Sequence, residues 1–311
     1  MNMKAKLMVL PALLALGAGS LPAMDSQLLS LVMPGAQVLA DVNVEQAKAT
    51  PFGQYVLAQI QSNGQHLQNL ETLTGFDPSR DLTELLLAST APGPKNGLVL
   101  ARGVFDAAKI SAAATQGGAT SETYKGVTIL VGPKANGAVA FPSPSLAIAG
   151  DLADVKGAID RLSVPAQLNQ ALAALVAAEA SANEDAWVAS TLPPSAFPQA
   201  AQNGAPVEAG VFQNITQFSG GVKFGNTVAL TGQAQTQRAE DAASLASVLQ
   251  FLANMAATNS KTAGPLAGVI GSTAISAQGN TVTVTASLPE DQFQQLVKQH
   301  APRGQTSRAP R

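Results

Sequence analysis

The residues best placed to do chemistry lie between Gly75 and Glu84, the most distinctive polar cluster of the chain. Asp77 and Asp81 stand four residues apart with Arg80 between them, and Glu84 follows. Carboxylates that converge in one site can bind a metal ion or serve as acid and base. The same residues are also typical of a turn at Asp77-Pro78, with Asp81 paired to Arg80. We favour the turn, and keep a hydrolase or metal-assisted enzyme at Asp77 and Asp81 as the alternative.

The sequence has few of the residues that other kinds of catalytic site require. The histidines are His66 and His300, and there is no cysteine, which excludes disulfides, iron–sulfur clusters and the usual zinc sites. No Gly-x-Ser-x-Gly motif is present to indicate a nucleophilic serine. The segment from Gly264 to Thr273 is similar to a phosphate-binding loop but lacks its lysine. We therefore expect no catalytic residue, no metal site and no cofactor.

Composition excludes further classes. Of 311 residues, 46% are hydrophobic and 12% charged, so disorder driven by charge is excluded over most of the chain. The net charge of −2 provides no electrostatic footprint for nucleic acid. The length leaves room for one large domain or two ordinary ones.

The N-terminus has the pattern of a secretory signal peptide. Lys4 and Lys6 precede an apolar stretch from Leu7 to Ala23, and small residues at its end favour cleavage after Ala23 or after Ser20. An uncleaved N-terminal anchor is the alternative. We expect an exported protein, periplasmic or secreted, with no transmembrane span once the signal is removed.

Short apolar runs followed at once by helix starts predict the secondary structure. One such unit runs from Leu146–Ile148 into a helix capped by Asp151, and others begin at Val228 and Val282. A longer helix opens at Pro51 and either continues to Leu73 or ends at Asn63-Gly64. Turn pairs predict hairpins between strands. These pairs are Lys125-Gly126, Gly225-Asn226 and Gly279-Asn280, with Pro142–Pro144 as a further turn.

These units together predict an α+β fold, in which antiparallel sheets built from hairpins have helices covering one face. Hairpin followed by helix occurs in both halves of the chain. We divide the mature chain into subdomains at 24–165 and 184–300, a helical connector at 166–183 and a disordered basic tail at 301–311. Duplication of one subdomain and repeated use of a common unit in one continuous sheet both fit the pattern.

Several short segments carry a resemblance to a known group of proteins. They are Leu31–Asn43, Pro51–Val56, Gly75–Leu82, Leu98–Gly103 and Ala149–Leu152. Together they resemble a family of uncharacterised exported bacterial proteins that has no established activity. The resemblance implies export, an α+β fold and no known enzyme class, and it transfers no functional residue to this chain.

The function expected from the sequence is therefore a non-enzymatic one. We expect an exported protein that binds an envelope partner or a small apolar ligand, with an apolar cavity between helices and sheet as the structural requirement of a carrier. Self-association into a homo-oligomer is a further possibility, because the low charge provides little repulsion between surfaces.

Overall fold

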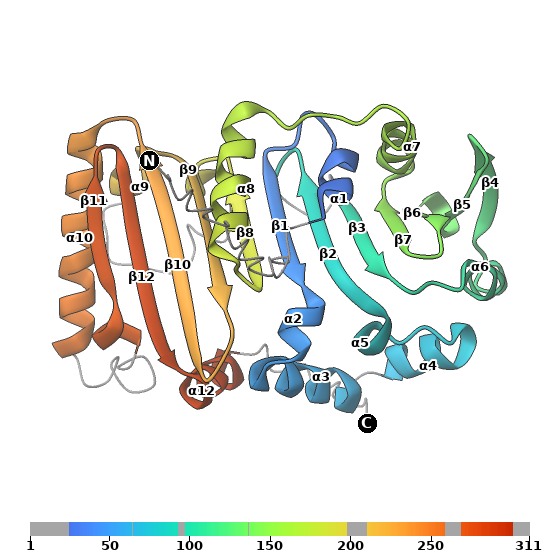
Figure 1. Ribbon diagram of the computed structural model, residues 1–311, viewed down its shortest axis with the longest axis horizontal. Coiled ribbons are helices and arrows are strands. Elements are labelled where there is room, and N and C mark those ends of the chain that lie inside the picture. Colours follow the sequence, from blue (N-terminus) through green and yellow to red (C-terminus); the bar gives the residue numbers. More distant parts are fainter. Residues whose placement is uncertain are drawn as a thin grey trace, which may run out of the picture.

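The computed structural model describes residues 25–63, 65–92, 97–135, 137–197, 210–258 and 269–300. The expected signal peptide, the basic tail and the first five residues of the segment from Gly264 to Thr273 lie outside these ranges. All strands belong to one antiparallel sheet of twelve strands (Figure 1). In chain order the strands are β1 (Val38–Asn43), β2 (Leu82–Ser89), β3 (Gly97–Gly103), β4 (Thr120–Tyr124), β5 (Val127–Val131), β6 (Ala138–Ser143), β7 (Leu146–Gly150), β8 (Ala186–Ser190), β9 (Ile215–Lys223), β10 (Thr227–Thr236), β11 (Ala274–Gln278) and β12 (Thr281–Pro289).

The helices connect these strands. They are α1 (Ser26–Leu31), α2 (Val44–Lys48), α3 (Pro51–Asn63), α4 (Gln65–Thr74), α5 (Pro78–Asp81), α6 (Ala107–Gln116), α7 (Leu152–Arg161), α8 (Gln170–Ala182), α9 (Gly210–Gln213), α10 (Ala239–Thr258) and α12 (Glu290–His300), with short 3₁₀ turns at Pro133–Ala135 and Pro194–Ala196. The helix that opens at Pro51 ends at Asn63, which is the shorter of the two predicted forms. Among the described residues, none of the helices has the length and apolar character needed to cross a membrane.

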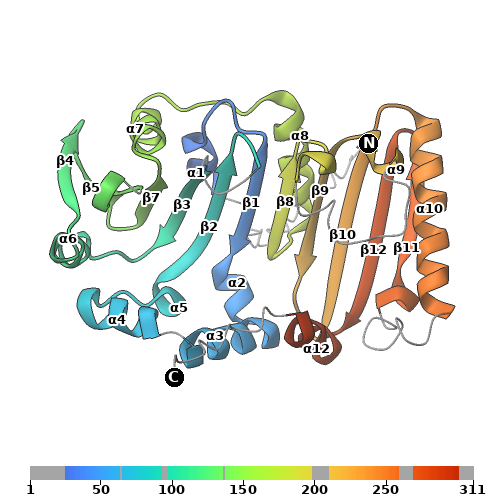
Figure 2. The same ribbon diagram turned by 180° about the vertical axis from the view of Figure 1, so that it is seen from behind.

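The order of the strands is similar on both sides of the sheet's centre. β1 and β8 pair there, antiparallel, as the views from front and back both show (Figures 1 and 2). Outward from β1 come β2, β3, β7 and β6, and outward from β8 come β9, β10, β12 and β11. A helix follows the third strand of each half, α6 after β3 and α10 after β10. Strands β5 and β4 extend the N-terminal half alone, so the two halves share an arrangement within one continuous sheet.

The larger core lies under α1, α7 and α8. Side chains alternate between the two faces of a strand, so Leu39, Leu86, Leu98 and Ile148 share the face that these helices cover. All four are at most 2% exposed. Burial of this many branched side chains, each contributing roughly 1.5–3 kcal/mol, fixes the register of the central strands.

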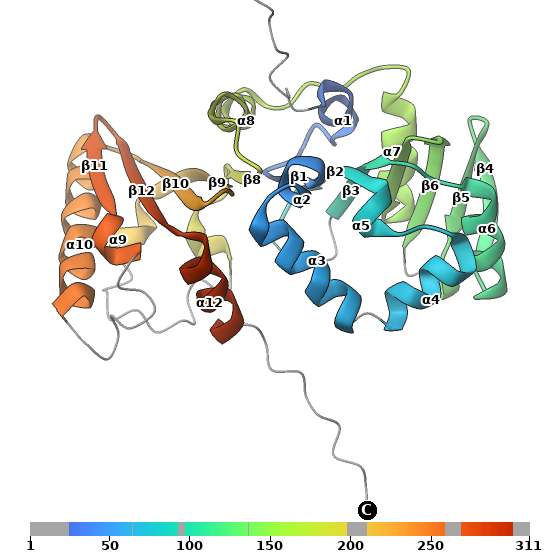
Figure 3. The ribbon, with the colours of Figure 1, turned by 60° about the horizontal axis from the view of Figure 1, so that its bottom comes forward.

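The smaller core lies on the opposite face of the sheet, under α10. Leu245 and Ala242 of α10 pack there on Val282 of β12 and Ile215 of β9. The α+β class and the antiparallel pairing are confirmed by this architecture. The helices were expected over one face, and the structure instead has α1 and α8 on one side of the sheet and α3, α4 and α12 on the other (Figure 3). The larger core, which extends onto β8, and the smaller core under α10 bury opposite faces of the sheet, so helices are needed on both sides.

Candidate functional site

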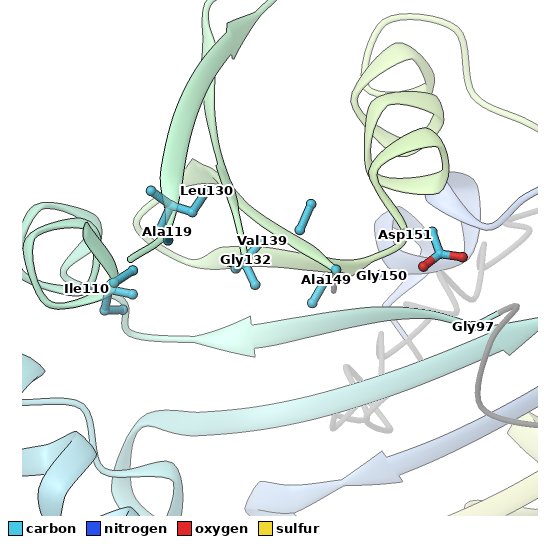
Figure 4. Close-up of a pocket in the computed structure, with 12 residues that line it drawn as sticks. Gly97, Ile110, Ala119, Leu130, Gly132, Val139, Ala149, Gly150 and Asp151 are labelled. Carbon is cyan, nitrogen blue, oxygen red and sulfur yellow. The ribbon is translucent and has the colours of Figure 1, made fainter. Parts of the chain in front are cut away.

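An open groove lies between α6 and the sheet in the N-terminal half. It has a volume of about 470 Å³. Figure 4 shows it bounded by α6 on one side and by the strand that leads into α7 on the other. The lining residues are almost all apolar or glycine: Gly97, Ile110, Ala114, Ala119, Leu130, Gly132, Gly137, Ala138, Val139, Ala149, Gly150 and Asp151. Size and lining are typical of a site for a small apolar molecule.

The groove exists because α6 stands away from the sheet. The helix begins at Asp106, whose carboxylate accepts a hydrogen bond of 3.0 Å from the backbone N–H of Lys109. Ile110 and Ala114 lie one helical turn apart and line the groove, but no residue of α6 is buried. The helix packs mainly against α4. A helix whose apolar side faces a sheet normally buries that side, and here the side stays half-exposed along the groove.

Small residues on the sheet leave the space of the groove open. Gly132, Gly137 and Gly150 lie at the ends of β5, β6 and β7, and Ala149 precedes Gly150. A Cβ atom at Gly150 would lie 2.8 Å from the carbonyl oxygen of Gly97, so the backbones of β3 and β7 approach closely there. Larger side chains at these positions would occupy the volume that the groove leaves open.

Asp151 is the one charged residue among the groove's lining residues. It is the N-cap of α7, as its residue type predicted, but its side chain makes no hydrogen bond to the helix amides. The sequence therefore predicted its position correctly and its bonding wrongly. The carboxylate lies at the end of the groove next to α7 (Figure 4).

A second group of charged residues, buried or half-buried, lies on the opposite face of the sheet. Asp41 is 5% exposed, and its Oδ1 atom has no hydrogen-bond partner. The pKa of Asp41 is raised to about 7, chiefly by burial and further by the negative charge of Glu84, while a hydrogen bond from Trp187 acts in the opposite direction. Burial also raises the pKa of Glu84, which accepts a hydrogen bond of 3.1 Å from the backbone N–H of Asp25.

Two ion pairs accompany Asp41 and Glu84. Arg102 pairs with Asp25 at the start of α1. Farther along the sheet, Asp185 is 1% exposed and accepts hydrogen bonds from Lys223 Nζ at 2.7 Å and from the backbone N–H of Phe224 at 2.6 Å. These ion pairs and hydrogen bonds join different elements of the fold. We therefore assign Asp25, Arg102 and Asp185 a structural role.

The carboxylates singled out from the sequence form a turn. Asp77 caps α5 by accepting from the N–H of Ser79 at 2.9 Å. Asp81 accepts from the N–H of Asp77 at 2.8 Å and from Arg80 Nε at 2.7 Å. Hydrogen bonding from Arg80 holds the pKa of Asp81 below its ordinary value. The structure therefore does not join Glu84, bonded to Asp25, with Asp77 and Asp81 in one site.

The two histidines lie in helices. His66 lies in α4 and His300 is the last residue of α12. Within the described residues there is no group of three or more histidine or acidic side chains that could hold a metal ion. The groove was missed from the sequence because glycine, alanine and isoleucine from five elements carry no motif. The one available signal was the prediction that helices on a sheet can enclose an apolar cavity.

Comparison with known proteins extends the description of the fold. No family model matches the chain, and no curated protein does. Crystal form III of the Treponema protein TP0453 superposes with a TM-score of 0.59 at 12% identity, covering 87% of this chain and 97% of that one. Crystal form I of TP0453 has a TM-score of 0.54 at 13% identity, covering 87% and 96%. Identities this low show a shared fold and nothing more.

Proposed function

We propose that this chain is an exported, non-enzymatic protein of the cell envelope that binds a small apolar ligand in the groove between α6 and the sheet. One observation carries the proposal: α6 has apolar residues facing the groove, yet none of its residues is buried. The N-terminal pattern of Lys4, Lys6 and the apolar stretch to Ala23 supports export.

A ligand in the groove would complete the packing of this part of the fold. Ile110 and Val139, which are half-buried, would each lose water from their apolar surface against it. Burial of apolar surface contributes roughly 25 cal/mol per Å² before the costs of binding are subtracted. The groove thus offers a ligand the apolar contact that α6 and the sheet do not make with each other.

The enzyme alternative has weaker support. Asp77, Asp81 and Arg80 bond to one another and to the adjacent backbone, which accounts for their presence without a substrate. An apolar groove with a single carboxylate offers no second group for acid–base catalysis.

The test compares two alanine-to-tryptophan variants on the same helix. Ala114 lines the groove, whereas Ala108 is exposed on α6 and does not line it. Protein purified from an exporting host without denaturation would be measured by native mass spectrometry. We expect an additional non-covalent mass on the wild type and on Ala108→Trp, and its loss in Ala114→Trp.

Two outcomes would overturn the proposal. One is an additional mass that persists in Ala114→Trp, because the ligand would then lie elsewhere. The other is a wild type that carries no ligand and that also fails to bind an added neutral apolar dye, N-phenyl-1-naphthylamine. In that second case, a measured mass equal to a whole-number multiple of the chain mass, with no ligand, would support self-association instead.

A further inference from the structure

Asp151 places a negative charge at one end of the groove, and this carboxylate makes no capping bond or ion pair within the described residues. Five other helices of the described chain begin at a residue whose side chain accepts a hydrogen bond from the first turn: Asp25, Asn43, Asp77, Asp106 and Asn169. Asp151 has the same position on α7 and makes no such bond. Within the described residues its carboxylate also has no ion pair.

The surroundings of Asp151 favour a positive partner over a negative one. Among the lining residues there is no cation that would neutralise this carboxylate. Lys134 belongs to the turn between β5 and β6, but it does not line the groove. A carboxylate at the end of an apolar groove attracts a cationic group and repels an anionic one.

The amides at the start of α7 act in the opposite sense. Unbonded N–H groups at a helix N-terminus attract anions, as does the helix dipole. Here the first turn carries a second carboxylate, Asp154, in addition to Asp151. Asp154 also interacts with the charge of Arg161, so the balance rests on Asp151. Its full negative charge exceeds the roughly half positive charge of a helix end, so the field at this end of the groove is negative.

We infer that the ligand is an amphiphile whose hydrocarbon part lies along Ile110, Leu130 and Val139 and whose cationic amine lies against Asp151. This inference rests on the binding function proposed above and adds the class of ligand. It excludes a fatty acid, whose carboxylate would face Asp151 across the end of the groove.

The experiment uses three ligands with the same alkyl chain and different head groups: decylamine, decanol and decanoate. Each displaces N-phenyl-1-naphthylamine from the full-length mature protein at neutral pH and low salt, below its micelle concentration. We expect decylamine to bind about five-fold more tightly than decanol, because an exposed pair of opposite charges adds a modest attraction of this size. Decanoate should bind most weakly. Added salt should reduce the difference between decylamine and decanol.

The variants separate the head-group inference from the binding proposal. Asp151→Asn should abolish the preference for decylamine over decanol, and Asp154→Asn is the matched control that should keep most of the preference. Equal or tighter binding of decanoate by the wild type would overturn the inference while leaving the binding function in place. Failure of all three ligands, or displacement that Ala114→Trp does not reduce, would overturn the binding function itself.

Discussion

The ring of Phe52 on α3 stacks against the ring of Phe224 at the turn between β9 and β10, with 4.8 Å between their centroids. Phe293 of α12 meets Phe52 edge to face at 4.7 Å. The three rings come from distant parts of the chain, one from the N-terminal half and two from the C-terminal half. They join α3 to α12 on the side of the sheet opposite α1 and α8 (Figure 3).

Removing the central ring should weaken the whole fold. Phe52→Ala removes three aromatic contacts, to Tyr55, Phe224 and Phe293, from a half-buried side chain. We expect a loss of about 2 kcal/mol in the free energy of unfolding. Phe251 on α10 is 64% exposed, so Phe251→Ala is the control and should cost less than about 0.5 kcal/mol. Urea unfolding of the two variants measures the difference. Equal stabilities would show that the ring cluster does not join the halves.

Gly53 marks a place where α2 and α3 approach closely. A Cβ atom at this position would lie 1.9 Å from the carbonyl oxygen of Ala47, which is backbone and cannot rotate away. Gly53→Ala should therefore destabilise the protein by about 2 kcal/mol, although alanine favours helix by about 1 kcal/mol. Gly271 has no atom within 4 Å of its added Cβ, so Gly271→Ala should be neutral or stabilising. Thermal unfolding of both variants shows whether the steric clash at Gly53 costs more free energy than the higher helix propensity of alanine provides.

Local features of this fold could be predicted from the sequence where the chemistry is local. Lys125-Gly126 predicted a hairpin, and both residues have the positive φ angles of its turn, 48° and 80°. Asn63-Gly64 predicted the break between α3 and α4. Asp77 and Asp81 were favoured as turn residues, and their bonds are those of a turn. In each case the residues that determine the structure are neighbours in the chain.

The sheet order and the groove depend on residues far apart in the chain. β1 pairs with β8 across more than a hundred residues, and no pattern in either strand specifies that partner. The groove depends on how far α6 stands from the sheet, which Ile110 and Ala114 do not encode by themselves. Asp151 has the residue type and the extended backbone of an ordinary cap residue, but its side chain makes no capping hydrogen bond. The division into two subdomains and a connector stays a prediction beside the single sheet.

Export has a direct test in the mass of the protein that leaves the cytoplasm. Cleavage after Ala23 should produce a chain that begins at Met24, and cleavage after Ser20 one that begins at Leu21. Leu14→Arg places a charge in the middle of the apolar stretch and should retain the full-length precursor in the cell. Intact-mass measurement of fractionated cells distinguishes these forms. A wild-type chain recovered from the envelope with Met1 or its neighbour still present would show an anchor in place of a cleaved signal.

The buried carboxylate of Asp41 should make stability depend on pH. Its pKa is raised from an ordinary 3.8 to about 7, first by burial and then by the charge of Glu84. Between these values the unfolded chain has lost the proton and the folded chain keeps it. Stability from this group is therefore complete below about pH 4 and declines as the pH rises to about 7, by at most ~4 kcal/mol.

Asp41→Asn tests this dependence because asparagine is similar in shape to the protonated acid and does not ionise. Near pH 4 the variant should be about as stable as the wild type, and above pH 7 it should be the more stable of the two, since the wild type then buries a charge with an unpartnered Oδ1. Glu84, whose pKa burial also raises, contributes in the same direction and remains in the variant, so a smaller decline persists. Urea unfolding across this pH range measures both curves, and parallel curves would show that Asp41 ionises no differently in the folded and unfolded chain.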